Sequence, residues 1–157
     1  SIGVYICTKK NLNKNLKKLK KYNRILVEKY IPGREIQVAV MNNKPLGAIE
    51  LKPKRKFYDY YAKYSSKAKT RHIMPAPLES KKYKEVLRIA RKAHHSLGCK
   101  GITRSDFRYH NNKFFLLEVN TQPGMTNLYL VPEIAAYKGI KFEDLVEWIV
   151  KDAGYDR

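Results

Sequence analysis

The stretch Phe114–Met125, which reads FFLLEVNTQPGM, is the strongest indication of the fold expected for this chain. Its apolar start predicts a strand, and the pair Pro123-Gly124 ends that strand in a turn. Side chains alternate across a strand, so Glu118 and Asn120 share one face. Mg²⁺ takes oxygen ligands, usually from one or two carboxylates plus substrate phosphates, which favours a metal site here. The alternative is that these two residues only lead out of the strand into solvent.

A second strand is expected over residues 101–109, and it forms a hairpin with the strand over residues 113–119. The register of this hairpin decides whether Asp106 lies opposite Glu118. A two-residue turn at the Asn-Asn pair would place Asp106 opposite Leu117 and turn Glu118 to the other face. We predict a three-residue loop that includes the following lysine, because it pairs the two carboxylates directly. A bound divalent cation would then relieve their repulsion.

The remaining hydrophobic periods predict an α+β domain over residues 1–157, with a mainly antiparallel sheet and helices packed on one side of it. In the strand over residues 34–41, three apolar side chains share one face, while Glu35, Gln37 and Ala39 share the other. Further strands are expected over residues 25–31, 46–51 and 71–74, and helices over residues 9–21, 80–97, 132–138 and 142–150.

The helix expected over residues 80–97 has an apolar stripe at helical spacing that includes Ala90 and Leu97. Gly98 follows it and is typical of a helix C-terminus. His94, late in this helix, is expected at the surface near the negative end of the helix dipole rather than as a ligand.

The charge balance is strongly basic, with 33 Lys and Arg residues against 14 Asp and Glu residues and a formal net charge of +19. Such a balance favours anionic partners. Lysines from an AT-rich genome, spread over solvated faces, are the alternative. The segment Phe57–Tyr64, FYDYYAKY, fits a platform for stacked bases, a lid over a ligand, or a loop packed on the sheet. The two cysteines are expected to be free thiols, and no apolar run is long enough to span a membrane.

Four segments, taken in order, resemble the C-terminal half of D-alanine–D-alanine ligases, which are members of the ATP-grasp superfamily. They are LVEKYIPGRE (residues 26–35), FYDYYAKY (57–64), GCKGITRSDF (98–107) and LLEVNTQPGMT (116–126). The resemblance implies the fold of an ATP-grasp C-terminal domain. It also implies a reaction in which ATP phosphorylates one D-alanine carboxylate before the amine of a second D-alanine attacks it.

The family's nucleotide residues are transferred to this chain where the residues match. The resemblance implies that adenine lies against Glu28, Lys29 and Ile31, that Glu35 accepts hydrogen bonds from the ribose hydroxyls, and that Lys63 reaches the terminal phosphate.

The metal and reaction residues follow in the same way. The resemblance implies two Mg²⁺ ions, or Mn²⁺ in their place, held by Asp106, Glu118 and Asn120. Arg104 and the backbone N–H of Gly124 would stabilise the tetrahedral oxyanion, Tyr64 would close the substrate side, and the second substrate would lie near Tyr129 and Leu130.

The chain departs from the family pattern in three ways. Tyr129 stands where the family has Ser, which crowds the pocket for the second substrate, and Tyr61 stands where an acidic residue is usual. The resemblance begins part-way through the family's pattern, so we expect this sequence to lack the family's N-terminal substrate domain and part of its central domain. We therefore expect a truncated ligase that is inactive alone, with a partner fragment supplied in trans or a gene remnant as further alternatives.

The expected partners are D-alanine and ATP, in a cytoplasmic protein that binds neither nucleic acid nor a membrane, and the full-length family members are expected to be homodimers. Two alternatives remain: another ATP-grasp carboxylate–amine ligase, and a basic module that binds nucleic acid through lysines and stacked tyrosines.

Overall fold

The structure, a computed structural model, describes residues 3–53, 70–126 and 129–154. The chain forms two compact units, residues 1–31 with 53–70, and residues 32–52 with 71–157. The tyrosine-rich segment expected over residues 57–64 lies outside the described residues, and with it the predicted site residues Lys63 and Tyr64.

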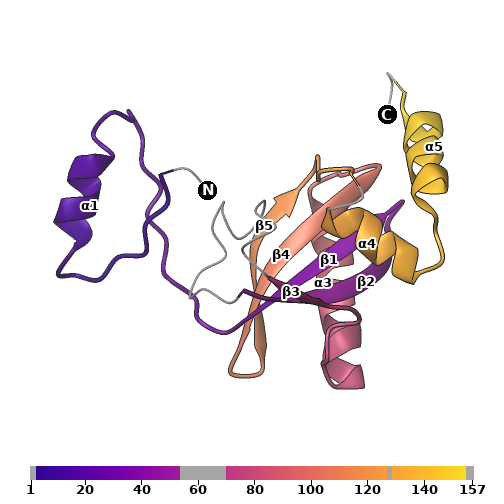
Figure 1. Ribbon diagram of the computed structural model, residues 1–157, viewed down its shortest axis with the longest axis horizontal. Helices are drawn as coiled ribbons and strands as arrows, with labels where there is room; N and C mark the ends of the chain where they lie inside the picture. Colours follow the sequence, from indigo (N-terminus) through magenta and orange to yellow (C-terminus); the bar gives the residue numbers. More distant parts are fainter. Residues whose placement is uncertain (1–2, 54–69, 127–128, 155–157) are drawn as a thin grey trace. The chain divides into compact units, whose positions relative to one another are not determined.

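The second unit is built on a five-stranded sheet in which every neighbouring pair of strands is antiparallel. Figure 1 shows β1 at the centre of the sheet, between β2 and β4, in the order β3-β2-β1-β4-β5. The strands are β1 (Arg34–Met41), β2 (Lys44–Lys52), β3 (Arg71–Ile73), β4 (Ile102–His110) and β5 (Lys113–Asn120). The predicted antiparallel α+β architecture is confirmed.

Two Asn-Asn pairs form the hairpin turns of this sheet. Asn42 and Asn43 have φ of 46° and 58°, and Asn111 and Asn112 have φ of 48° and 59°. Two successive residues with positive φ make the two-residue turn that matches the twist of antiparallel strands, and Asn tolerates this conformation better than most residues. The three-residue loop predicted for the second hairpin is therefore wrong.

One face of the sheet packs against α3 (Ser80–Ser96). Val86 and Ala90 of this helix are fully buried. The sheet supplies alternate apolar side chains from its three central strands, as the period of two requires. The buried cluster comprises Ile36, Val38, Val40, Ala48, Ala76, Val86, Ala90 and Phe107.

A second helix, α4 (Leu130–Tyr137), contacts the opposite face. Nδ1 of His72 lies 2.7 Å from Oε2 of Glu133 in α4. His72 pairs with Leu51, and Leu51 with Glu35, so all three project to the face away from α3. The helices therefore lie on both faces of the sheet, not on one as expected.

The sequence of β2 explains the second helix. All six residues of Leu46–Leu51 are buried, although alternate side chains point to opposite faces. A strand that is buried on both faces needs cover on both. The final helix, α5 (Phe142–Asp152), contacts α4 and buries Leu145 fully.

The first unit has little regular structure among its described residues. Its one described helix, α1 (Leu12–Lys18), is seven residues long, shorter than expected, and buries no side chain. The strand expected over residues 25–31 is wrong: these residues form no strand, and Leu26 and Val27 are 81% and 67% exposed. A strand needs a partner for its backbone N–H and C=O groups, and no described segment pairs with this one.

None of the described helices has the length and hydropathy needed to cross a membrane.

Two expectations for α3 are corrected at its C-terminal end. Leu97 is 63% exposed, while His94 is 1% exposed, with Nδ1 2.8 Å from Oγ1 of Thr103. The helical stripe that faces the sheet therefore ends on His94 and not on Leu97. Burial lowers the pKa of His94, because the charged imidazolium is poorly solvated there.

This buried histidine predicts a stability that depends on pH. In the unfolded chain His94 takes up a proton near its ordinary pKa of 6.5, while in the folded chain it stays neutral to lower pH. Its contribution is present above pH 6.5 and is lost as the pH falls toward the lower folded pKa. The free energy of unfolding should therefore fall in this window, by at most about 1.4 kcal/mol per pH unit.

Urea unfolding at pH 7.5, 6.5, 5.5 and 5.0 measures this slope. His94→Asn, which retains a nitrogen near Thr103 but does not titrate, should flatten it, and His110→Asn serves as the matched control. An unchanged slope in His94→Asn would contradict the assignment.

Candidate active site

The register between β4 and β5 places two carboxylates side by side. Asp106 pairs with Glu118, as expected, although the turn has only two residues. The difference is a β-bulge: Phe107 pairs with Leu116, and Leu117 is the extra residue. One inserted residue reverses the face of every side chain beyond it. The bulge thus turns Glu118 to the face of Asp106, which the turn alone would not have done.

An arginine connects the acidic side chains on this face. Arg104 donates two hydrogen bonds to Asp106, from Nε to Oδ1 at 2.7 Å and from Nη2 to Oδ2 at 3.0 Å. Its Nη2 also lies 3.8 Å from Oε1 of Glu118. The side chains of Arg104 and Asp106 are 11% and 10% exposed, whereas that of Glu118 is 60% exposed. The site is thus closed on the Arg104 side and open to solvent at Glu118.

The third oxygen ligand predicted, Asn120, pairs with Arg104 across the strands and so lies on the same face. Its Oδ1 accepts a hydrogen bond from the N–H of Gln122 at 2.9 Å, which turns the chain out of β5. The structure thus brings Arg104, Asp106, Glu118 and Asn120 together on two neighbouring strands.

These oxygens fit a hard divalent cation whose coordination is completed by a ligand. A carboxylate offers about four lone-pair sites, so Asp106 retains acceptor capacity beyond its two bonds to Arg104. Within the described residues no group of three or more His, Cys, Asp and Glu side chains could hold a metal ion. Two carboxylates and one amide match the sparse protein ligation of Mg²⁺, which relies on substrate phosphates for further ligands.

The predicted nucleotide residues fall in both units. Glu35 lies farther along the same face of the second unit, with Oε2 3.4 Å from Nη2 of Arg108. Glu28, Lys29 and Ile31 lie in the first unit, in a segment without regular structure, where Glu28 and Lys29 are exposed and Ile31 is half-buried.

The predicted substrate residues lie at the N-terminus of α4. The ring of Tyr129 packs directly on Gly124: a Cβ placed on Gly124 would lie 2.3 Å from both Cδ1 and Cε1 of the ring. Leu130, the first residue of α4, is 7% exposed, so its side chain belongs to the core. The tyrosine thus occupies the space beside the Pro-Gly turn.

Two residues on this face were not among the predicted site residues. Arg108 pairs with Glu35 across β1 and β4, and Gln37 pairs with Asp106. Gln37 is 1% exposed, and its Oε1 has no hydrogen-bond partner among the described residues. The alternation of the two strands contained this signal, since it places Glu35 and Gln37 of β1, and Arg104, Asp106 and Arg108 of β4, at alternate positions.

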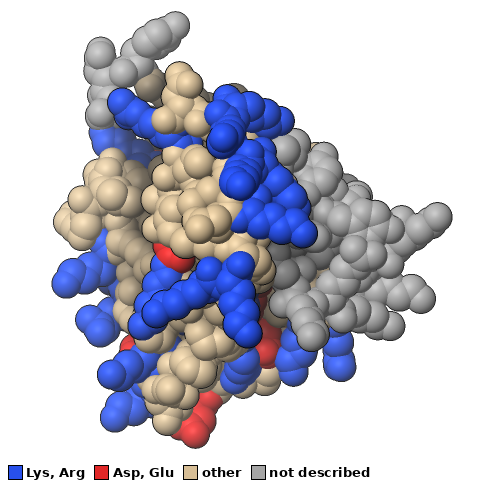
Figure 2. All heavy atoms as spheres, turned by 90° about the vertical axis from the view of Figure 1, so that its left-hand side faces the viewer, with Lys and Arg blue, Asp and Glu red and all other residues tan. Residues whose placement is uncertain are grey.

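The basic surplus of the chain is visible at its surface. Figure 2 shows one face on which Lys and Arg side chains are spread among uncharged ones, with few Asp or Glu side chains in view. A positive surface of this kind raises the local concentration of anionic ligands.

Solved structures define the class of fold. The chain matches the D-alanine–D-alanine ligase of Bacillus anthracis with a TM-score of 0.79 and 28% identity, over 94% of this chain and 48% of that one. A structure of that ligase complexed with ATP gives a TM-score of 0.77 and 25% identity, over 92% and 46%. The ligase of Coxiella burnetii gives a TM-score of 0.77 and 26% identity, over 95% and 40%. The fold is that of the C-terminal part of ATP-grasp ligases.

The family itself is shown by sequence. Residues 1–151 match the family model described as D-ala D-ala ligase C-terminus, and the chain belongs to this family. A D-alanine–D-alanine ligase of Pelagibacter ubique is 64% identical over 157 residues, which are 100% of this chain and 52% of that protein. One of Rhodopseudomonas palustris is 45% identical over 166 residues, 100% of this chain and 54% of that protein. The chain spans about half the length of the curated relatives it matches.

The contact between Tyr129 and Gly124 predicts a coupled pair of substitutions. Gly124→Ala should destabilise the fold by about 1–3 kcal/mol, because the new methyl group overlaps the ring. In a Tyr129→Ala background the same substitution should cost less than half as much, since the ring is gone. Equilibrium urea unfolding of the four chains of this double-mutant cycle measures the coupling. Equal costs in both backgrounds would show that the ring does not restrict Gly124.

Proposed function

We propose that this chain is the nucleotide- and metal-binding part of a D-alanine–D-alanine ligase that uses ATP and Mg²⁺. The reaction is phosphorylation of a D-alanine carboxylate by ATP, followed by attack of the amine of a second D-alanine on the acyl phosphate. Membership in the family supports this proposal, and so do relatives about twice as long that have this name.

The observation that supports it best is the face shared by Asp106, Glu118 and Asn120. Phosphoryl transfer asks a protein mainly for positioning and for neutralisation of charge. Bound Mg²⁺ would supply Lewis acidity and neutralise phosphate charge. The chain's own task is to hold three oxygen ligands on two rigid strands, where the bulge at Leu117 fixes their spacing.

Arg104 has two tasks in this proposal. Its two hydrogen bonds hold Asp106 in one orientation. Its positive charge would also stabilise the oxyanion that forms during the acyl step. The N–H of Gly124 is the second donor. Removal of one such donor in other enzymes raises the barrier by about 3 kcal/mol.

The remaining roles complete the nucleotide and substrate sites. Adenine would lie against the segment that includes Glu28, Lys29 and Ile31. Glu35 would hold the ribose, and Lys63 would reach the terminal phosphate. Tyr64 would close the substrate side.

The second substrate would approach Tyr129 and Leu130. Because the tyrosine fills the space beside Gly124, another ATP-grasp carboxylate–amine ligase is the second candidate for the acceptor specificity. A cytoplasmic location, a homodimer of the full-length protein and Mn²⁺ in place of Mg²⁺ belong to the same proposal.

The metal-ligand proposal predicts a nucleotide effect that depends on Mg²⁺. With Mg²⁺, ATP at a hundred times its Kd should raise the free energy of unfolding of the 157-residue chain by about 2.7 kcal/mol, and the same ATP concentration without Mg²⁺ should raise it less. Asp106→Asn and Glu118→Gln should each lose the Mg²⁺-dependent part, because each removes a charged ligand. Thermal unfolding with ATP, with and without Mg²⁺, measures it.

Glu85→Gln is the matched control, since this carboxylate pairs with Lys82 on α3 and takes no part in the proposed site. A Mg²⁺ effect that survives in both site variants would contradict the ligand assignment. Binding of single-stranded DNA that falls steeply with salt and ignores both variants would favour the nucleic-acid alternative.

The 157-residue chain should not turn over. With ATP, Mg²⁺ and D-alanine it should release no phosphate above the rate of a chain-free control. The reason is that the family's contacts to the first D-alanine, and two lysines that bind phosphate, are expected in its N-terminal and central segments. A coupled phosphate assay measures this. Phosphate release by the 157-residue chain by itself would contradict this prediction. Phosphate release only after addition of an N-terminal fragment would support complementation in trans.

A further inference from the structure

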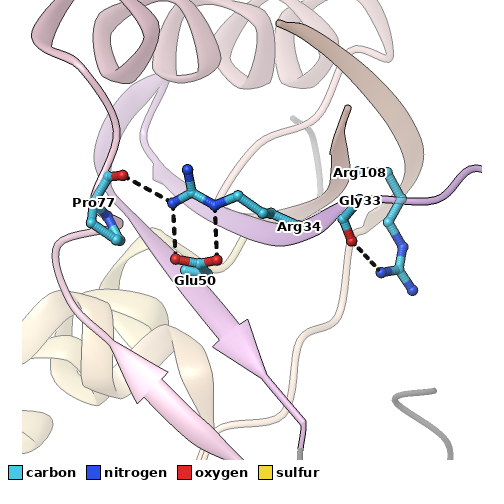
Figure 3. Close-up of polar contacts among 5 residues, drawn as sticks. All are labelled: Gly33, Arg34, Glu50, Pro77 and Arg108. Atoms are coloured by element: carbon cyan, nitrogen blue, oxygen red, sulfur yellow. Dashed lines mark hydrogen bonds and ion pairs between the residues drawn. The ribbon is translucent and has the colours of Figure 1, made fainter. Parts of the chain in front are cut away.

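Two arginines fix the start of β1 from opposite faces of the sheet. Figure 3 shows Arg34 reaching Glu50 and the carbonyl of Pro77 on one side, while Arg108 reaches the carbonyl of Gly33 from the other. Successive side chains of a strand point to opposite faces, so neighbours in sequence are held by different partners.

The first arginine lies on the α3 side of the sheet, where its side chain is 35% exposed. Nε and Nη2 of Arg34 donate to the carboxylate of Glu50 at 2.8 Å and 2.9 Å, and Nη2 also donates to the Pro77 carbonyl at 2.9 Å. Glu50 is 1% exposed, and its hydrogen bond raises the pKa of Arg34. All these partners are internal, so the function of this pair is structural.

The second arginine acts on the face of the candidate site. Arg108 lies opposite Glu35 in the β1–β4 register. Its Nη1 donates to the carbonyl of Gly33 at 3.2 Å, and its Nη2 lies 3.4 Å from Oε2 of Glu35. The side chains of Arg108 and Glu35 are 13% and 12% exposed. One guanidinium therefore holds both the backbone before Glu35 and the carboxylate itself.

The backbone at this point has little freedom to adjust. Gly33 has φ of 111°, and a Cβ there would lie 2.3 Å from the carbonyl oxygen of Tyr109. Such a close approach to β4 admits only glycine. The strand therefore leaves this point in one direction, and the remaining freedom of Glu35 is that of its side-chain torsions, which Arg108 restricts.

We propose that Arg108 is a positioning residue that orients Glu35 to accept hydrogen bonds from the vicinal diol of the nucleotide sugar. The inference rests on the proposed function, in which Glu35 holds the ribose. An ionised carboxylate accepts only, and it has lone pairs for two hydroxyl donors besides a guanidinium. A fixed orientation matters because two adjacent hydroxyls must meet one carboxylate without loss of side-chain entropy on binding.

The consequence is that Arg108 determines selectivity for ribose. A hydrogen bond to a charged group accounts for roughly tenfold or more in affinity. We expect the unsubstituted chain to bind Mg²⁺-ADP about tenfold more tightly than the 2′-deoxy and 3′-deoxy forms. In Arg108→Gln this preference should fall below about threefold, chiefly through weaker binding of the ribonucleotide, and Glu35→Gln should give the same pattern.

Isothermal titration of the 157-residue chain with the three diphosphates, in the presence of Mg²⁺, measures both affinity and preference. Arg34→Gln is the matched control: it makes the same chemical change one residue before Glu35, on the opposite face. It should lower the melting temperature while it leaves the ribose preference intact. Arg108→Lys retains the positive charge but not the planar group with several N–H donors, and it should give an intermediate preference for ribose.

The outcomes separate the inference from the proposed function. Failure of the unsubstituted chain to bind any of the three nucleotides would overturn both. If the unsubstituted chain prefers the ribonucleotide about tenfold and Arg108→Gln retains this preference, the inference about Arg108 is overturned while the proposed function is not. An equal loss of affinity for all three nucleotides would also overturn it, since that is the pattern of a merely structural residue. Should Arg108→Gln fail to fold, the preference of Arg108→Lys decides by the same criteria.

Discussion

The pairing of β4 with β5 is the constraint on which the candidate site depends. Antiparallel strands fix which side chains are neighbours, and a shift by one residue reverses every face beyond it. The tight Asn-Asn turn sets one register, and the bulge at Leu117 changes it before Glu118. The carboxylate then faces Asp106 and Arg104. Like charges opposite one another are unfavourable without a cation between them. In the structure Arg104 supplies that positive charge, because it binds Asp106 and lies 3.8 Å from Glu118.

The two faces of the sheet pack against different helices, and this difference leaves the paired carboxylates of β4 and β5 outside the apolar core. The α3 face is a continuous apolar core that takes side chains from three strands. On the other face α4 covers β2, while β4 and β5 present charged side chains. Buried ion pairs contribute little net stability compared with apolar packing, although loss of one partner is costly. The pairs Arg104–Asp106 and Arg108–Glu35 lie on this face, which is consistent with a site, whereas among the described residues the α3 side has the pair Arg34–Glu50.

Much of the fold could be predicted from local patterns. The alternation in β1 identified the polar face of Glu35 and Gln37, and the Asn-Asn pairs marked both hairpins, because turn chemistry and alternation are properties of a few adjacent residues. The strand expected over residues 25–31 failed, since a strand exists only with a partner. The prediction that His94 lies at the surface was wrong for a related reason. Its burial depends on how far α3 extends over the sheet, where His94 lies beside Thr103.

The family, the strands of the hairpins and the residue types of the candidate site could be predicted from the amino-acid sequence, because they are local patterns of side chains. The short turn, the extra residue Leu117 and the contact between Arg108 and Glu35 became known only from the folded chain. A bulge arises from the balance of contacts across two strands, and a cross-strand ion pair from their register. The bulge and the ion pair each depend on two strands together, so neither can be deduced from the sequence of one strand.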